Sequence, residues 1–205
     1  MGSGGYFTVA RWRGIPIKIH WSAPIGAVLW TGGSPSLARI CAWVFMIVLH
    51  ELGHAVLVRR AGAWVTHVTV HGMGGECWWQ GDVTPIERAM IAFGGVWAQG
   101  LLALGAFAFA WISPPETQLA FDLIDMFTRY NLYNAAFNLV PVPPLDGSQA
   151  WKLFPLLWKK WRYGALERRK KANRRKLKVI EGELKELLKD AARRTNQRRD
   201  DDLLN

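Results

Sequence analysis

Hydrophobic residues are gathered into four long segments of this chain, and short polar stretches separate these segments. The second segment, Leu37–Val58, contains only Arg39 and Glu51 as charged residues besides its two histidines. A helix crosses the hydrocarbon layer of a membrane with about 20 apolar residues. We therefore expect an all-α polytopic membrane protein with about four transmembrane helices, which run over about Ile19–Thr31, Leu37–Val58, Ile86–Ile112 and Leu119–Val142.

The third and fourth segments differ in composition. The third is rich in Ala and Gly, as close packing of membrane helices requires. The fourth carries Asp122, Asp125, Arg129 and several Asn residues, so it cannot face lipid on all sides. We expect this segment to be buried among the other helices or to line a wet cavity. A buried pair between Asp125 and Arg129, four residues apart on a helix, is the simplest explanation of its charges.

Lys and Arg residues lie in alternate connections between the segments. Arg11, Arg13 and Lys18 precede the first segment, and Arg59 and Arg60 follow the second. The connections over residues 32–36 and 113–118 contain neither residue type. Because cytosolic loops are enriched in Lys and Arg, this pattern predicts a multi-pass protein of the cell membrane with both termini in the cytosol.

The loop after the second segment contains a candidate β-hairpin. Residues Trp64–His71 alternate and are rich in β-branched side chains, which favours a strand. Gly72–Gly75 turns the chain, and Cys77–Gln80 returns as a second strand. We therefore add a small cytosolic β-hairpin to the helical fold.

The C-terminal part of the chain is strongly basic. Of the 26 Lys and Arg residues, 18 lie after Asp146, together with 8 of the 16 acidic residues, so this part carries the whole net charge of +10. We divide the chain into a membrane-embedded core, residues 1–163, and a basic cytosolic helical tail, residues 164–205. The tail has an apolar stripe on a charged helix, formed by Leu177, Ile180, Leu184, Leu187 and Ala191.

Several partners fit this tail. Its basic run, Arg168–Lys178, suits the anionic cytosolic leaflet of the membrane. Nucleic acid or an acidic protein would be attracted by the same charge, but both are less favoured, and a solvated helix without a partner is a further alternative. The apolar stripe would also allow self-association through the C-terminal helix.

The second apolar segment contains His50-Glu51-Leu52-Gly53-His54, an HExxH motif. On a helix this spacing puts two imidazoles on one face, where both can reach a single Zn²⁺ ion. Glu51, between them, is placed to take a proton from a water molecule. Ionisable residues at membrane depth are costly and mark functional sites. We therefore predict one Zn²⁺ ion per chain within the membrane.

A catalytic zinc site normally has three protein ligands, so a third must come from elsewhere. Asp146 is the strongest candidate, because the prolines before it break the fourth helix and Gly147 permits a tight turn. His50 and His54 lie roughly 7–13 Å from the cytosolic helix end at Arg59, and Asp146 approaches from the same side. Glu76 and Asp82 are the next candidates.

The pair HELGH and NxxPxxPLDG resembles the site-2 protease family of intramembrane zinc metalloproteases, over roughly Ile17–Leu153. The resemblance implies zinc ligands at His50, His54 and Asp146, a general base at Glu51, and a polar residue beside the centre at Asn138. Asn138 could instead pin the broken backbone. Many members have Gly-Pro and a later Asn in the third segment, where this chain has Gly95-Val96 and Gln99.

The resemblance implies hydrolysis of peptide bonds in or near transmembrane segments of membrane-protein substrates. An extended substrate would bind by adding a strand to the edge at Val65–His71. The alternative is a non-proteolytic zinc-binding membrane scaffold whose basic tail recruits a partner. Glu51 argues against the scaffold, because a structural zinc site has no use for a general base.

Overall fold

The computed structural model describes residues 4–31, 36–164, 166 and 173. The chain divides into two compact units, Met1–Leu156 and Leu157–Asn205, and the fold and the candidate site both belong to the first. Residues 157–164, 166 and 173 of the second unit are helical. The apolar stripe and nearly all of the predicted basic tail lie outside the described residues.

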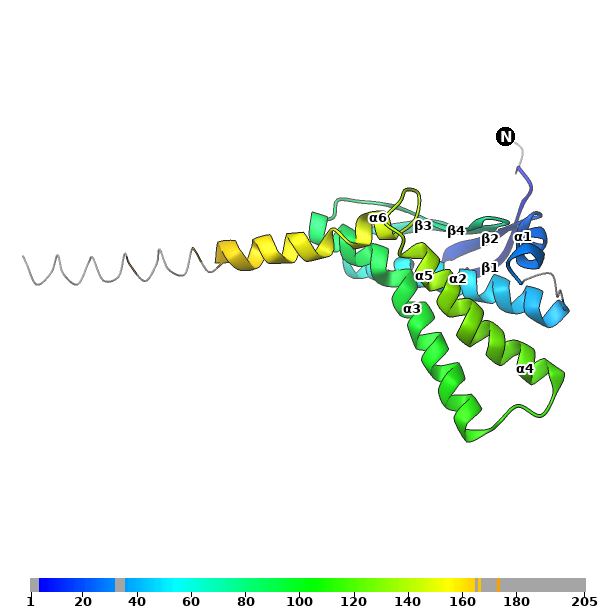
Figure 1. The fold of residues 1–205 in the computed structure, drawn as a ribbon. Coiled ribbons are helices and arrows are strands. Elements are labelled where there is room, and N and C mark those ends of the chain that lie inside the picture. The colour runs from blue at the N-terminus through cyan, green and yellow to red at the C-terminus, as the bar shows by residue number, and fades with distance from the viewer. Residues whose placement is uncertain (1–3, 32–35, 165, 167–172, 174–205) are drawn as a thin grey trace, which may run out of the picture. The chain divides into compact units, whose positions relative to one another are not determined.

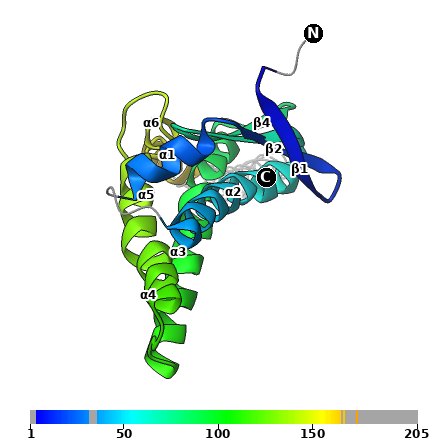
Figure 2. The same ribbon diagram turned by 90° about the vertical axis from the view of Figure 1, so that its right-hand side faces the viewer.

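The first unit contains two pairs of consecutive strands, and helices follow each pair (Figures 1 and 2). Their bounds, in chain order, are β1 Tyr6–Trp12, β2 Ile15–His20, α1 Ala23–Trp30, α2 Leu37–Arg60, β3 Trp64–His71, β4 Gly74–Gln80, α3 Pro85–Ile112, α4 Gln118–Asp125, the π-helix η1 Met126–Tyr130, α5 Asn131–Asn138 and α6 Gly147–Ala150. The sheet lies along one side of α2, and α3 crosses this helix on another side (Figures 1 and 2).

Two of the described helices, α2 with 24 residues and α3 with 28, are long and apolar enough to cross a membrane. The prediction of four spanning helices is therefore not confirmed. The first apolar segment is divided between the end of β2 and α1, whose eight residues would span only about 12 Å. The fourth becomes α4, η1 and α5, which bury Asp122, Asn131 and Asn134 against the other helices.

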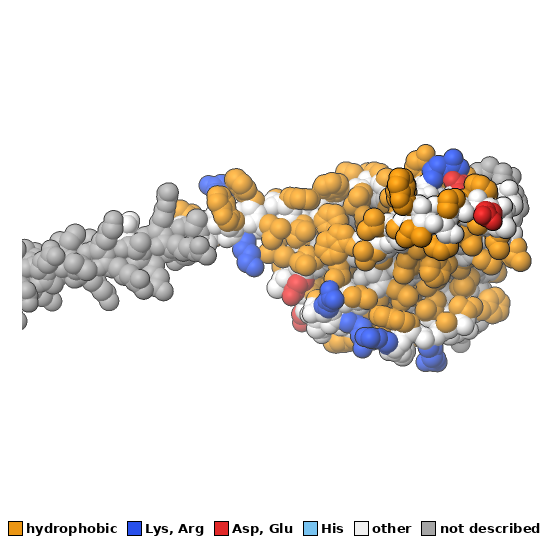
Figure 3. Space-filling model, turned by 90° about the horizontal axis from the view of Figure 1, so that it is seen from below, with side chains coloured by type: hydrophobic (Ala, Val, Ile, Leu, Met, Phe, Trp, Pro, Cys, Tyr) orange, Lys and Arg blue, Asp and Glu red, His pale blue; other side chains and the backbone are white. Residues whose placement is uncertain are grey.

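The face seen in Figure 3 is covered by hydrophobic side chains, on the side toward which α3 and α4 project in Figure 1. Soluble proteins rarely expose an apolar surface of this extent, whereas contact with lipid requires one. Large apolar residues that are exposed on α3 and α4 include Leu101, Leu104, Phe107, Phe109, Trp111, Leu119 and Phe121.

The sheet is larger than the predicted hairpin. Strands β3 and β4 do form that hairpin, but β1 and β2 form a second one, and β2 pairs with β3 in parallel to give the order β1-β2-β3-β4. Ile17, Val68 and Ala55 meet in one buried cluster between the sheet and α2. Because β3 is central, the prediction that Val65–His71 offers a free edge is wrong, and β4 is the edge on this side.

Helices α2 and α3 approach each other closely through glycine. A Cβ atom added at Gly53 would lie 2.8 Å from the Cβ atom of Ala98 and 2.8 Å from the carbonyl carbon of Gly94. Small residues therefore let the two backbones come together, as is common between membrane helices. This contact brings the histidine-bearing face of α2 against α3.

The charged residues of the fourth segment hold α4 to the start of α2. Arg39 bonds to Asp122 at 3.0 Å and lies 3.6 Å from Asp125, and Ser36 donates to Asp122 at 3.1 Å. The predicted pair between Asp125 and Arg129 is present at 3.0 Å, but Arg129 is 56% exposed, so that pair is not buried. The buried carboxylate is Asp122 instead.

Candidate metal centre

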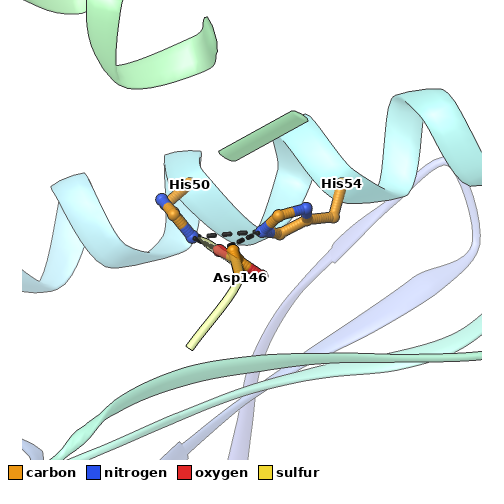
Figure 4. Close-up of side chains that lie close together, drawn as sticks. All are labelled: His50, His54 and Asp146. Carbon is orange, nitrogen blue, oxygen red and sulfur yellow. Dashed lines mark hydrogen bonds and ion pairs between the residues drawn. The ribbon is translucent and has the colours of Figure 1, made fainter. Parts of the chain in front are cut away.

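The three predicted ligands come together in the first unit (Figure 4). His50 and His54 project from adjacent turns of α2, and Asp146 directly precedes α6. The Asp146 Oδ2 atom lies 2.9 Å from His50 Nε2 and 3.1 Å from His54 Nε2. The two Nε2 atoms are 3.1 Å apart. All three side chains thus point one ligand atom at the same place.

Hydrogen bonds on the far side of each imidazole assign its protonated nitrogen. His50 Nδ1 lies 2.9 Å from Gln99 Oε1, and His54 Nδ1 lies 2.7 Å from the Ile91 carbonyl oxygen. Both partners are acceptors, so both Nδ1 atoms carry the proton and both Nε2 atoms present lone pairs.

Three electron-pair donors therefore face one another without a proton between them, which is an arrangement that a cation stabilises. Two nitrogen ligands about 2.05 Å from a tetrahedral Zn²⁺ ion are separated by about 3.3 Å, close to the spacing of these atoms. The donor set, two imidazoles and one carboxylate, is also one that zinc uses in catalytic sites. His50, His54 and Asp146 thus lie close enough to bind a metal, and they fit zinc.

A chain of side-chain amides supports His50 from behind. Gln99 is fully buried, and its Nε2 donates to Asn134 Oδ1 at 3.0 Å, which turns its Oε1 toward His50. Asn138 Nδ2 donates to the same Asn134 oxygen at 3.2 Å. Asn138 therefore connects to His50 through two other amides. Sequence analysis did not identify Asn134, and it treated Gln99 only as a departure from the family pattern.

The Asp146 loop is fixed at both ends. Helix α5 ends at Asn138, and Pro141, Pro143 and Pro144 prevent its continuation. Trp151 Nε1, beyond the loop, donates to the Leu139 carbonyl oxygen at 2.6 Å. A Cβ atom at Gly147 would lie 2.5 Å from the Val140 carbonyl oxygen, so only glycine permits this close return.

The local electrostatics favour Asp146 as a ligand over Cys77. An Asp carboxyl group is ordinarily ionised at neutral pH, so Asp146 presents a charged oxygen ligand. Burial raises the pKa of the Cys77 thiol to about 12, helped by the charges of Glu51 and Asp146. Cys77 is therefore a neutral thiol, which is a poor metal ligand.

The other two candidates for the third ligand do not join the three ligand atoms. The Glu76 carboxylate accepts a hydrogen bond from Trp78 Nε1 at 2.9 Å, and Asp82 is exposed. Among the described residues, the group of three that could hold a metal ion contains neither of them.

Glu51 is buried, with 4% of its surface exposed, and it lines a cavity of about 570 Å³. A Cβ atom at Gly75 of β4 would lie 2.6 Å from Glu51 Oε1. Glycine at this position therefore leaves room for the carboxylate beside the edge strand. The cavity wall also contains His50, His54, Asp146, Asn138, Gly74, Glu76, Trp79 and Arg88.

Gly95 of α3 lies directly against the His50 ring, which an added Cβ atom would overlap. We expect Gly95→Ala to displace this ring and to destabilise the fold by about 1–3 kcal/mol through overpacking. Zinc content per chain and the thermal midpoint should both fall. Gly100→Ala, with nothing within 4 Å of its added Cβ atom, is the matched control on the same helix. Equal zinc content in the two variants would contradict the tight contact at His50.

Comparisons with known proteins identify relatives of this chain. No protein-family profile matches it. The protein named "Putative zinc metalloprotease Rip3" from Mycobacterium tuberculosis is 28% identical over 178 residues, which cover 74% of this chain and 44% of that protein. The protein named "Putative zinc metalloprotease MJ0611" from Methanocaldococcus jannaschii is 30% identical over 129 residues, which cover 54% of this chain and 67% of that protein.

This chain belongs to the site-2 protease family. The solved structure of the site-2 protease from Methanocaldococcus jannaschii has the same fold, with a TM-score of 0.58 at 21% identity over 76% of this chain and 73% of that one. The chain spans about half the length of the Rip3 relative that it matches. Membership in this family of zinc metalloproteases agrees with the ligand geometry and with the two long apolar helices.

Proposed function

We propose that this protein is an intramembrane zinc metalloprotease that hydrolyses peptide bonds in or near transmembrane segments of membrane proteins. His50, His54 and Asp146 would hold the metal, and Glu51 would be the general base. The observation that carries this proposal is the position of Glu51. Its carboxylate lines the same cavity as the three ligands and comes from the helix that bears both histidines.

The residues would divide the reaction between them. A bound Zn²⁺ ion supplies Lewis acidity, which polarises a carbonyl group and acidifies water. Glu51 takes a proton from the attacking water and gives it to the leaving amine. The Gln99 amide holds the His50 ring in one tautomer and orientation. Asn138 lies in the cavity wall, where its amide can bond to the substrate backbone while Asn134 positions it.

The substrate would bind as an extended strand along β4. An intact helix hides its amides in its own hydrogen bonds, so a substrate segment must unwind before attack. The edge strand β4 carries Gly74, Gly75, Glu76, Cys77 and Trp79 into the cavity wall. Its unpaired backbone groups can pair with an unwound segment. This pairing replaces the predicted addition at β3.

We also propose an orientation in the membrane and a location for the tail. The alternation of Lys- and Arg-containing connections supports a multi-pass arrangement with both termini in the cytosol. The cavity is lined by His50, Glu51 and His54, which lie in the half of α2 nearer Arg60, and in that arrangement it would open toward the cytosol. The basic tail, residues 164–205, would then lie on the anionic leaflet, with self-association through its apolar stripe as the second proposal.

Metal removal tests the proposed function. We expect the purified protein in detergent to cleave a peptide that contains a hydrophobic transmembrane segment, to lose this activity with a zinc chelator, and to regain it with stoichiometric Zn²⁺. Mass spectrometry of the products locates the cleaved bond. Cleavage that persists after complete removal of the metal would contradict the proposal.

A further inference from the structure

The cavity contains one fixed positive charge that the proposed chemistry does not use. Among the described residues that line the cavity, Arg88 is the only Lys or Arg. It lies in the first turn of α3, and it is an exposed residue of the cavity wall. The other ionisable groups of the wall are acidic side chains, histidines and the Cys77 thiol.

The Arg88 side chain is held in place by an aromatic ring. Its guanidinium carbon lies 5.2 Å from the ring centroid of Trp79, within the range of a cation–π interaction. Trp79 belongs to β4 and packs against a buried cluster that contains Val58 and Ile91. The charge is therefore held at one end of the strand along which the substrate would bind.

Two independent paths give the separation between Arg88 and the reaction centre. On α3, Gly95 lies against His50, and seven residues of helix from Gly95 to Arg88 span about 10 Å. On β4, Gly75 lies beside Glu51, and four residues of strand from Gly75 to Trp79 span about 13 Å. Because an extended peptide advances about 3.3 Å per residue, both paths correspond to three or four substrate residues.

Resting on the proposed function, we infer that Arg88 is a specificity-determining residue that selects substrates with an Asp or Glu side chain three or four residues from the cleaved bond. A guanidinium group that is already oriented by Trp79 loses little freedom on binding a carboxylate. Glu76, the acidic residue of β4, already accepts the hydrogen bond from Trp78.

Arg88 also rejects the commonest alternative substrates. Cytosolic segments beside transmembrane helices are enriched in Lys and Arg. A basic side chain brought next to Arg88 would meet a like charge, and like charges across an interface are an effective means of discrimination. The protease would therefore pass over most membrane proteins and act on those with an acidic cytosolic flank.

The test reverses the charge of a side chain in the enzyme and the charge of a side chain in the substrate. The probes are hydrophobic peptides with blocked ends. Each carries Asp, Gln or Lys at one test position and is otherwise identical. The test position is varied over the five residues on each side of the cleaved bond. Blocked ends exclude a terminal carboxylate as the group that is recognised. We expect wild-type kcat/KM to be about tenfold higher for Asp than for Lys, three or four residues from the bond on one side.

Arg88→Glu should reverse the order of the Asp and Lys peptides at that position and at no other. The readout is the ratio of kcat/KM for the Asp peptide to kcat/KM for the Lys peptide, measured with one enzyme. A general loss of activity lowers both values and leaves this ratio unchanged. Arg60→Glu reverses another exposed positive charge that is not part of the cavity wall, and should leave the ratio as in wild type.

The outcomes separate the inference from the proposed function. Equal ratios in wild type and Arg88→Glu, with all peptides cleaved, would overturn the role of Arg88 and leave the protease activity established. Reversal by Arg60→Glu as well would reduce the effect to net charge and would also overturn it. If the zinc-loaded enzyme cleaves none of the peptides, the proposed function and the inference fail together.

Discussion

The Glu51→Gln variant should bind zinc as the wild type does and should cleave its substrate about 10²–10⁴-fold more slowly. Gln has nearly the same shape as Glu, so it fits into the narrow space beside Gly75. An amide cannot take a proton from water, so only the proton transfer is lost. The measurements are zinc content per chain and kcat/KM for a peptide that the wild type cleaves.

A matched change elsewhere isolates this effect. Glu116 lies exposed in the loop before α4, and Glu116→Gln makes the same chemical change without approaching the cavity. We expect wild-type zinc content and activity from this control. If Glu51→Gln cleaves as fast as the wild type, the general-base role is wrong. If Glu51→Gln loses zinc together with its activity, Glu51 helps to hold the metal. A wild-type protein with zinc but without any cleavage would favour the non-proteolytic scaffold.

Sequence analysis identified the three residues that come together at the candidate metal centre, and for two of them the information is local. The spacing of His50 and His54 places both rings on one face of any helix, so their geometry follows from helix periodicity alone. Asp146 followed from the family resemblance and from the prolines that end α5. The structure adds that the three ligand atoms do meet, which no local pattern could establish.

The supporting residues could not be found in the same way. Gln99 and Asn134 are far apart in the sequence and become partners only because α3 and α5 pack together. A single Gln in an Ala- and Gly-rich helix looks like a packing residue. One signal could have identified Gln99. Burial of an amide in an apolar helix costs free energy unless the amide has a hydrogen-bonding partner, so such a partner was to be expected.

The errors in the predicted fold also have a physical cause. Apolar composition does not distinguish a spanning helix from the end of a buried strand followed by a short helix, and the first segment is of the second kind. The four-stranded sheet was missed because the parallel pairing of β2 with β3 joins segments separated by α1 and α2. With β3 central, the proposed substrate-binding edge moves to β4, which is the strand that meets Glu51.

The Asp146→Ala variant should weaken zinc binding by more than about 100-fold, because loss of a supporting contact alone costs about 10–100-fold and this change removes a ligand. His50 and His54 would remain held by Gln99 and the Ile91 carbonyl group, so two ligands would stay in place. Competition with a chromophoric chelator measures the zinc affinity, and peptide cleavage should be lost in parallel.

Two further variants decide what the loss means. Asp146→Glu keeps a carboxylate on a longer side chain, so it should recover part of the zinc affinity if the oxygen is a ligand. Asp82→Ala removes an exposed carboxylate that is not part of the three-residue group, and should bind zinc as the wild type does. Full zinc affinity in Asp146→Ala would show that another residue completes the site. A loss in Asp82→Ala of the same size would identify that residue, and the assignment of Asp146 would be wrong.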